Sequence, residues 1–109
     1  MTVKELVEGL ESSGLEVAYY EFPQGKAPEP PYLLYYFPNS DDFFADGINY
    51  SGIEALNVEL YTNRKDFTTE AKVEKALNDL GLSYVRSEQY ITSEKMYEVL
   101  FETEVLING

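Results

Sequence analysis

The sequence contains no cysteine and no histidine among its 109 residues. Without cysteine there can be no disulfide, no thiolate zinc site and no thiol nucleophile. Without histidine the chain also lacks Ser–His–Asp triads, most transition-metal sites and the commonest general base near neutral pH. We therefore predict that the chain is not an enzyme and has no catalytic residues, cofactor or metal site.

Basic residues are also scarce, because 8 of them stand against 20 acidic residues and give a formal net charge of −12. So few cations cannot replace the counterions of a phosphate backbone, which argues against specific nucleic-acid binding. A solvated acidic surface is the simplest interpretation, and repulsion or mimicry of DNA is the functional alternative. No apolar run has the length of a membrane span or a signal peptide, so we expect a cytoplasmic protein without a membrane partner.

Aromatic residues, by contrast, are abundant, with ten tyrosines and six phenylalanines making 15% of the chain. Tyrosine combines an apolar ring with a polar tip, which suits strands and protein interfaces. A hydrophobic content of 44% is enough for one core. The length and composition predict a single domain over residues 1–109.

Two stretches have the apolar spacing of amphipathic helices. Thr2 and Glu5 fit a capping box at the start of the first, and Gly14 is placed to stop it. Asp66 is the expected N-cap of the second, and Gly81 its stop. The apolar positions are Val3, Leu6, Val7 and Leu10 in the first helix, and Val73, Ala76, Leu77 and Leu80 in the second.

Strands are expected at residues 15–22, 32–37, 53–62, 83–92 and 95–106, where β-branched and aromatic residues are enriched. The run "YLLYYF" at 32–37 is apolar on both faces, so this strand should be central or lie at a subunit contact. A hairpin centred on Asp46-Gly47 is expected over residues 43–50. The fold class is thus predicted as α+β, with two helices packed on one face of a sheet of about four main strands plus the hairpin. Antiparallel pairing should dominate, with a mixed sheet left open.

Acidic residues in two places were candidates for chemistry. Asp41, Asp42 and Asp46 resemble a calcium loop only superficially, because Phe44 and Ile53 occupy ligand positions. We expect these aspartates to solvate the turn. Glu98, Glu102 and Glu104 alternate along a strand, which usually marks a solvent-facing side and not a paired-carboxylate site.

Several short segments, in their order and spacing, together resemble one known family. They are "AYYEF", "APEPPYLLYYFP", "FFADGINY", "VELYTNRKD", "TTEAKVEKAL" and "SEQYITSEKMYEVLFETEV". The pattern is similar to the tail-terminator or tail-completion proteins of siphophages and prophages of Gram-positive bacteria. The resemblance implies a structural virion protein, assembled in the host cytoplasm into a homo-oligomeric ring, commonly a hexamer. Its partners would be the tail tube protein and the head-completion protein, and no catalytic residue comes with it.

On this hypothesis the proline arm, which we define as residues 22–31, and the hairpin reach neighbouring subunits, while acidic residues face the lumen and repel passing DNA. The predicted interface residues are Pro23, Pro28, Pro30, Pro31, Tyr35, Tyr36, Phe43, Phe44, Ile48 and Tyr50. An alternative hypothesis is an acidic monomeric inhibitor that mimics DNA toward a host DNA-binding protein. A carboxylate-only enzyme ranks last, because no carboxylate pair has a recognised spacing.

Overall fold

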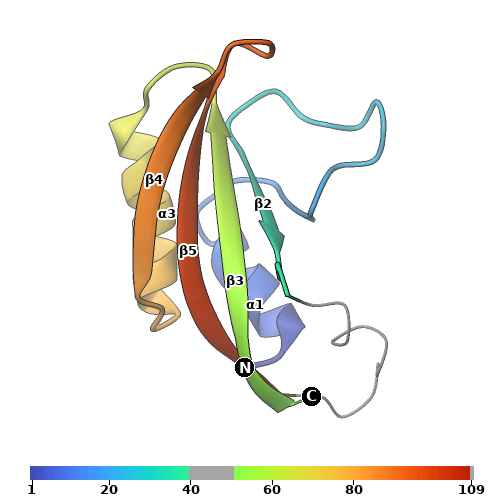
Figure 1. Ribbon diagram of the computed structural model, residues 1–109, viewed down its shortest axis with the longest axis vertical. Helices are drawn as coiled ribbons and strands as arrows, with labels where there is room; N and C mark the ends of the chain where they lie inside the picture. Colours follow the sequence, from blue (N-terminus) through green and yellow to red (C-terminus); the bar gives the residue numbers. More distant parts are fainter. Residues whose placement is uncertain (40–50, 109) are drawn as a thin grey trace.

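The elements form in the order that the sequence patterns predict. The computed structural model describes residues 1–39 and 51–108. In these ranges the order is α1 (Val3–Glu11), β1 (Val17–Tyr19), β2 (Tyr32–Tyr36), β3 (Ser51–Thr62), α3 (Phe67–Asp79), β4 (Tyr84–Ile91) and β5 (Met96–Asn108). Both helices lie behind the sheet in Figure 1, on the same face of it. The predicted α+β class is therefore confirmed.

Both helices begin with the caps expected from the sequence. The Glu5 amide donates to Thr2 Oγ1 at 3.1 Å and the Thr2 amide donates to Glu5 Oε1 at 2.9 Å, which completes the capping box of α1. Asp66 accepts from the Thr69 amide at 3.0 Å at the start of α3. Gly81 follows α3 with φ +77°, a left-handed conformation that ends helices.

The sheet is mixed, with the strand order β1-β2-β3-β5-β4. β2–β3, β3–β5 and β4–β5 are antiparallel, whereas β1 and β2 are parallel. Parallel pairing requires a long return, and residues 20–31 supply it between Tyr19 and Tyr32. β2 is internal, and Leu33, Leu34 and Tyr35 are all buried, which confirms the prediction of a central strand.

The predicted bounds were wrong for three strands, β1, β3 and β5. β1 covers only Val17–Tyr19 of the expected 15–22, because Tyr20 has φ +66° and turns the chain out of the strand. β3 and β5 are longer than expected, since Ser51 still pairs with Asn108. The predicted hairpin at 43–50 lies outside the described residues.

The core lies between the helices and one face of the sheet. Strand alternation sends Leu56, Val58 and Leu60 of β3 to that face, and Val99, Phe101 and Val105 of β5 beside them. All six are at most 2% exposed. The helices complete the core with Leu6, Leu10, Val73 and Leu77.

A cluster of paired charges joins α3 to β4 at the edge of the sheet. Glu70 faces inward from α3 with a side chain only 2% exposed, and it pairs with Lys65 at 2.7 Å. Arg86 of β4 donates to Glu70 as well and to Glu74 at 2.8 Å. A buried carboxylate is tolerated only when it is paired in this way.

Within the described ranges, no helix has both the length and the apolar character needed to cross a bilayer.

Candidate interaction surface

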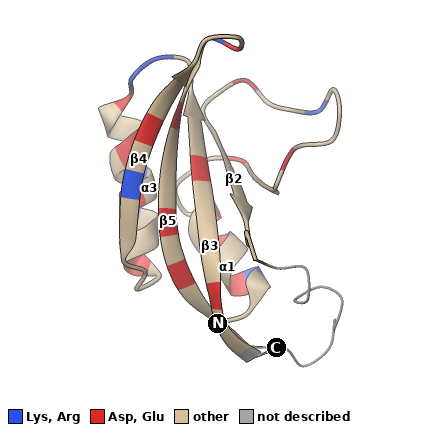
Figure 2. Cartoon of the chain, in the orientation of Figure 1, with Lys and Arg blue, Asp and Glu red and all other residues tan. Residues whose placement is uncertain are grey.

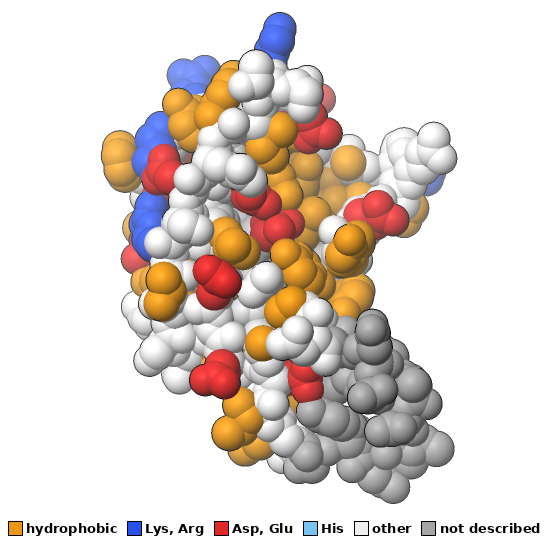
Figure 3. All heavy atoms as spheres, viewed as in Figure 1, with side chains coloured by type: hydrophobic (Ala, Val, Ile, Leu, Met, Phe, Trp, Pro, Cys, Tyr) orange, Lys and Arg blue, Asp and Glu red, His pale blue; other side chains and the backbone are white. Residues whose placement is uncertain are grey.

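The face of the sheet turned away from the helices is the most distinctive surface of the molecule, and we call it the open face. Its members follow from the strand register. They are Tyr32, Leu34 and Tyr36 of β2; Ile53, Ala55, Asn57, Glu59 and Tyr61 of β3; Glu98, Leu100, Glu102, Glu104 and Leu106 of β5; and Val85, Ser87 and Gln89 of β4. Figure 3 shows this side, on which acidic and apolar side chains alternate. Tyrosines and glutamates thus meet on one surface.

A chain of hydrogen bonds crosses the open face from β2 to β4. Asn57 Nδ2 donates to the Tyr36 hydroxyl, which donates to Glu59 Oε2, both at 3.2 Å. The Tyr61 hydroxyl lies 2.9 Å from Glu59 Oε1 and 2.9 Å from Glu98 Oε2. Gln89 Nε2 donates to Glu98 Oε1 at 2.6 Å. Each of these polar side chains therefore has a hydrogen-bond partner on a neighbouring strand or on its own strand.

Two carboxylates share one phenol hydrogen in this network, because Tyr61 has a single hydroxyl proton to donate. Burial raises the pKa of Glu59, and the neighbouring Glu98 raises it further, against the opposing effect of hydrogen bonds from Tyr61 and Tyr36. Burial and the hydrogen bond to Glu59 likewise raise the pKa of Tyr61. The protonated form of Glu59 therefore persists to higher pH than that of an ordinary glutamate, and Tyr61 keeps its hydroxyl proton for the two carboxylates.

Glu98 corrects one prediction from the sequence. It was expected on a solvent-facing side with Glu102 and Glu104, but Glu98 is only 8% exposed. The reason is its position opposite Tyr61 in the β3–β5 register, where the tyrosine ring and hydroxyl cover it. Glu102 and Glu104 are exposed, as expected.

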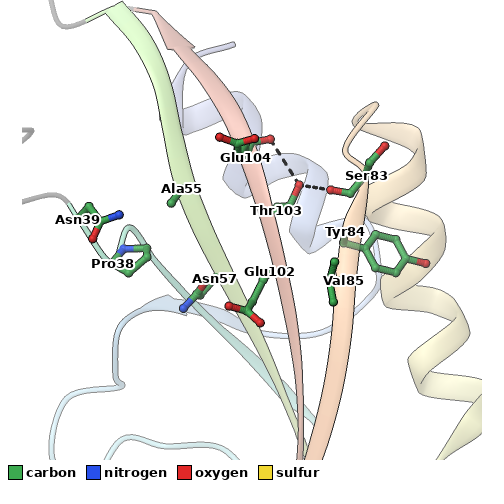
Figure 4. Close-up of a pocket in the computed structure, with 10 residues that line it drawn as sticks. All are labelled: Pro38, Asn39, Ala55, Asn57, Ser83, Tyr84, Val85, Glu102, Thr103 and Glu104. Atoms are coloured by element: carbon green, nitrogen blue, oxygen red, sulfur yellow. Dashed lines mark hydrogen bonds between the residues drawn. The ribbon is translucent and has the colours of Figure 1, made fainter.

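A hollow of about 550 Å³ lies farther along the open face, between the end of β2 and the start of β4 (Figure 4). Glu102 and Glu104 of β5 line it, beside Asn57 of β3. Val85, which is 70% exposed, lines the hollow from β4. No basic side chain lines the hollow among the described residues. The hollow thus combines free carboxylates with an apolar wall.

The proline arm is attached to the open face through aromatic contacts. Phe22 meets Tyr32 edge-to-face at 5.3 Å, and Tyr32 stacks on Tyr61 at 5.3 Å between ring centroids. Just before the arm, Tyr20 meets Tyr36 at 5.5 Å. Such ring pairs add stabilisation beyond their buried area. Beyond this base, the loop projects from the body of the molecule in Figures 1 and 3.

The predicted interface residues fall into three groups. Pro23 and Pro31 are exposed in the arm and Pro28 and Pro30 are half-buried. Tyr36 is half-buried on the open face, but Tyr35 points into the core and is 7% exposed, which leaves it little surface for a partner. The remaining predicted residues, Phe43, Phe44, Ile48 and Tyr50, lie outside the described residues, as do Asp41, Asp42 and Asp46. The interface itself stays a prediction.

The described residues contain no group of three or more acidic side chains arranged to hold a metal ion. The strongest feature that sequence reasoning missed is the Glu59–Tyr61–Glu98 network. The sequence indicated only that Glu59 and Tyr61 lie on the same face of one strand. That Glu98 of β5 lies beside them follows from the β3–β5 register, which the sequence does not show.

No protein-family model matches this sequence, and no curated protein matches it. Among solved structures, the fold is similar to a chain of the virion of a native gene transfer agent particle, with a TM-score of 0.57. The similarity covers 99% of this chain and 92% of that chain, at 14% sequence identity. The shared feature is the fold, over nearly the whole length of both chains.

Proposed function

We propose that the chain is a structural virion protein, a tail terminator or tail-completion component that forms a ring at the head–tail junction. The observation that carries the proposal is the fold, which is similar over 99% of the chain to a protein of a gene transfer agent virion. The sequence resemblance to tail-terminator proteins likewise implies a structural virion protein.

The surface supports an assembly role better than a chemical one. No helix of the described residues covers the open face, its hollow carries exposed apolar and acidic side chains, and a proline-rich arm projects from the molecule. Surfaces that combine tyrosine, exposed apolar residues and a polar rim are typical of protein interfaces. A net charge of −12 per copy would also keep DNA from adhering to a ring through which it passes.

The direct test is the mass of the purified protein in solution, measured by light scattering over a wide range of concentrations, with and without tail tube protein. We expect a closed oligomer of one defined size, and binding of that oligomer to the end of tube assemblies. A protein that remains monomeric under both conditions, and does not bind tubes, would contradict the proposal.

A second candidate function is an acidic monomeric inhibitor of a host DNA-binding protein. The exposed, unpaired carboxylates of Glu102 and Glu104 favour it, but Glu59 and Glu98 are hydrogen-bonded to Tyr61 and interrupt any continuous row of free carboxylates. This function requires salt-sensitive binding to a basic host protein. A pulldown at low salt that recovers no such protein would exclude it.

A further inference from the structure

The proline arm carries one basic side chain, and it lies in an exposed turn. Residues 23–27 are exposed, and the Lys26 amide donates to the Pro23 carbonyl at 2.8 Å to close the turn around Gly25, which has φ +75°. The Lys26 side chain has no ion-pair partner in the described part of the chain. Four prolines and the aromatic base restrict the arm, so little freedom remains to be lost when it binds.

The hollow on the open face is acidic, opposite in charge to the Lys26 side chain. Glu102 and Glu104 stand exposed at its floor, and neither carboxylate has an ion-pair partner among residues 1–39 and 51–108. Val85 and Pro38 give the hollow an apolar side. An occupant that fits this chemistry is a short exposed segment with one cation and several apolar or small residues, and the arm's "PQGKAP" is such a segment.

The arm and the hollow of one copy do not meet in this structure. The arm ends at Pro31, directly before β2, whereas Pro38 and Asn39 of the hollow follow β2. The five residues of β2 separate them by about 16 Å. Figure 1 shows the arm projecting at the other end of this strand. An arm seated in the hollow would therefore belong to a second copy.

We propose that the arm of one copy seats in the hollow of a second copy, where the Lys26 ammonium pairs with Glu102 and Glu104. This inference rests on the proposed ring-forming function and names the contact that would build the ring. The two surfaces are different patches of the same chain, so the contact between copies is heterologous, that is, it joins two unlike surfaces. Heterologous contacts produce a ring when the rotation that relates neighbouring copies closes on itself, and a filament when it does not.

Cysteine cross-linking tests the contact, because the chain has no cysteine of its own. Copies carrying Lys26→Cys are mixed with copies carrying Glu104→Cys and oxidised under native conditions. We expect a disulfide-linked dimer from the mixture, and a ladder of linked oligomers from the double variant. The control is a mixture of Lys95→Cys with Glu104→Cys, because Lys95 is exposed in the turn at the far end of β4. That mixture should give no dimer above the level of either variant alone.

The outcomes separate this contact from the proposed function. Oligomers of defined size that do not cross-link through Lys26→Cys would overturn the arm contact and leave the ring intact. Cross-linked chains that never close would support the contact and contradict the ring. A protein that neither assembles nor cross-links would overturn both.

Charge exchange gives a second readout. Lys26→Glu should weaken self-association about tenfold at low salt, and adding Glu104→Lys to the same chain should restore most of the loss. Lys95→Glu makes the same charge change and should leave self-association within about twofold of the unmodified protein. If the Lys26 and Lys95 variants weaken association equally, net charge and not the arm explains the effect, and the proposal fails.

Discussion

At the scale of single residues, the titration of the Glu59 carboxylate reports on the hydrogen-bond network of the open face. Its pKa in the folded protein is raised, first by burial. The folded protein then binds more protons than the unfolded chain between the ordinary carboxyl pKa and the raised one, so Glu59 lowers stability as pH rises through that window. Glu59→Gln removes this effect and keeps an oxygen that can accept from Tyr36 or Tyr61. We expect the variant to gain stability relative to the unmodified protein as pH rises from about 4.5 to 8.

The measurement is urea unfolding of both proteins at several pH values, compared as a difference in the free energy of unfolding. Tyr61→Phe gives an internal check, because the Tyr61 hydrogen bond lowers the pKa of Glu59. Its loss should extend the pH-dependent decline to higher pH. A Glu59→Gln difference that stays constant from pH 4.5 to 8 would show that Glu59 is not perturbed.

At the scale of elements, the approach of α1 to α3 depends on Gly9. A Cβ built there would lie 2.4 Å from Leu80 Cδ2 and 2.7 Å from Leu80 Cγ. Gly9→Ala should therefore lower the free energy of unfolding by about 1 kcal/mol, although alanine favours a helix over glycine by a similar amount. In a Leu80→Ala background the clash is gone, so the same change should raise stability by about 1 kcal/mol. Thermal unfolding of the four proteins checks this reversal of sign, and the same sign in both backgrounds would refute it.

The charge cluster between α3 and β4 should matter more than an ordinary surface pair. Arg86→Met removes a partner of the buried Glu70 and leaves it with Lys65. We expect a loss of about 3 kcal/mol in the free energy of unfolding. Lys75→Met is the matched control, since Lys75 and Asp79 form an exposed pair within α3, and its effect should stay below about 0.5 kcal/mol. If denaturant unfolding shows the same loss in the free energy of unfolding for both variants, the cluster contributes no more than an exposed ion pair.

Elements whose signals are local could be predicted from the sequence, and those that depend on distant residues could not. The helix caps at Thr2 and Asp66 involve neighbours three residues away, so both could be predicted from the local sequence. The parallel pairing of β1 with β2 depends on the path of the intervening loop, and the early end of β1 depends on the left-handed Tyr20, which no propensity indicates.

The candidate surface was predictable in part for the same reason. Alternation along β5 placed Glu98, Glu102 and Glu104 on one face, but only the register with β3 shows that Tyr61 covers Glu98 and not the other two. The inward-facing Glu70 had a readable signal, because it falls on the apolar stripe of α3 with Val73 and Leu77. A charge on such a stripe usually indicates a buried ion pair.

At the scale of the whole molecule, the net charge should produce repulsion between the particles in solution, whether these are single copies or closed oligomers. A net charge of −12 on 109 residues should give a strongly repulsive second virial coefficient at about 10 mM salt. We expect static light scattering to show this coefficient falling as salt rises toward 0.15 M, where the Debye length is about 8 Å. A coefficient that does not change with salt would mean that charge does not limit association.

The charge cluster of α3 and β4 has a kinetic consequence for meetings between copies. Residues 63–91 hold five basic and five acidic side chains, so the entire net charge of −12 lies in the rest of the chain. Two copies that drift together are repelled most where their acidic parts face each other and least at the neutral α3–β4 flank (Figure 2). The start of β4 on this flank also borders the hollow. Repulsion between copies would therefore be weakest for approach at the α3–β4 flank, beside the hollow, and stronger for approach at the acidic parts of the molecule.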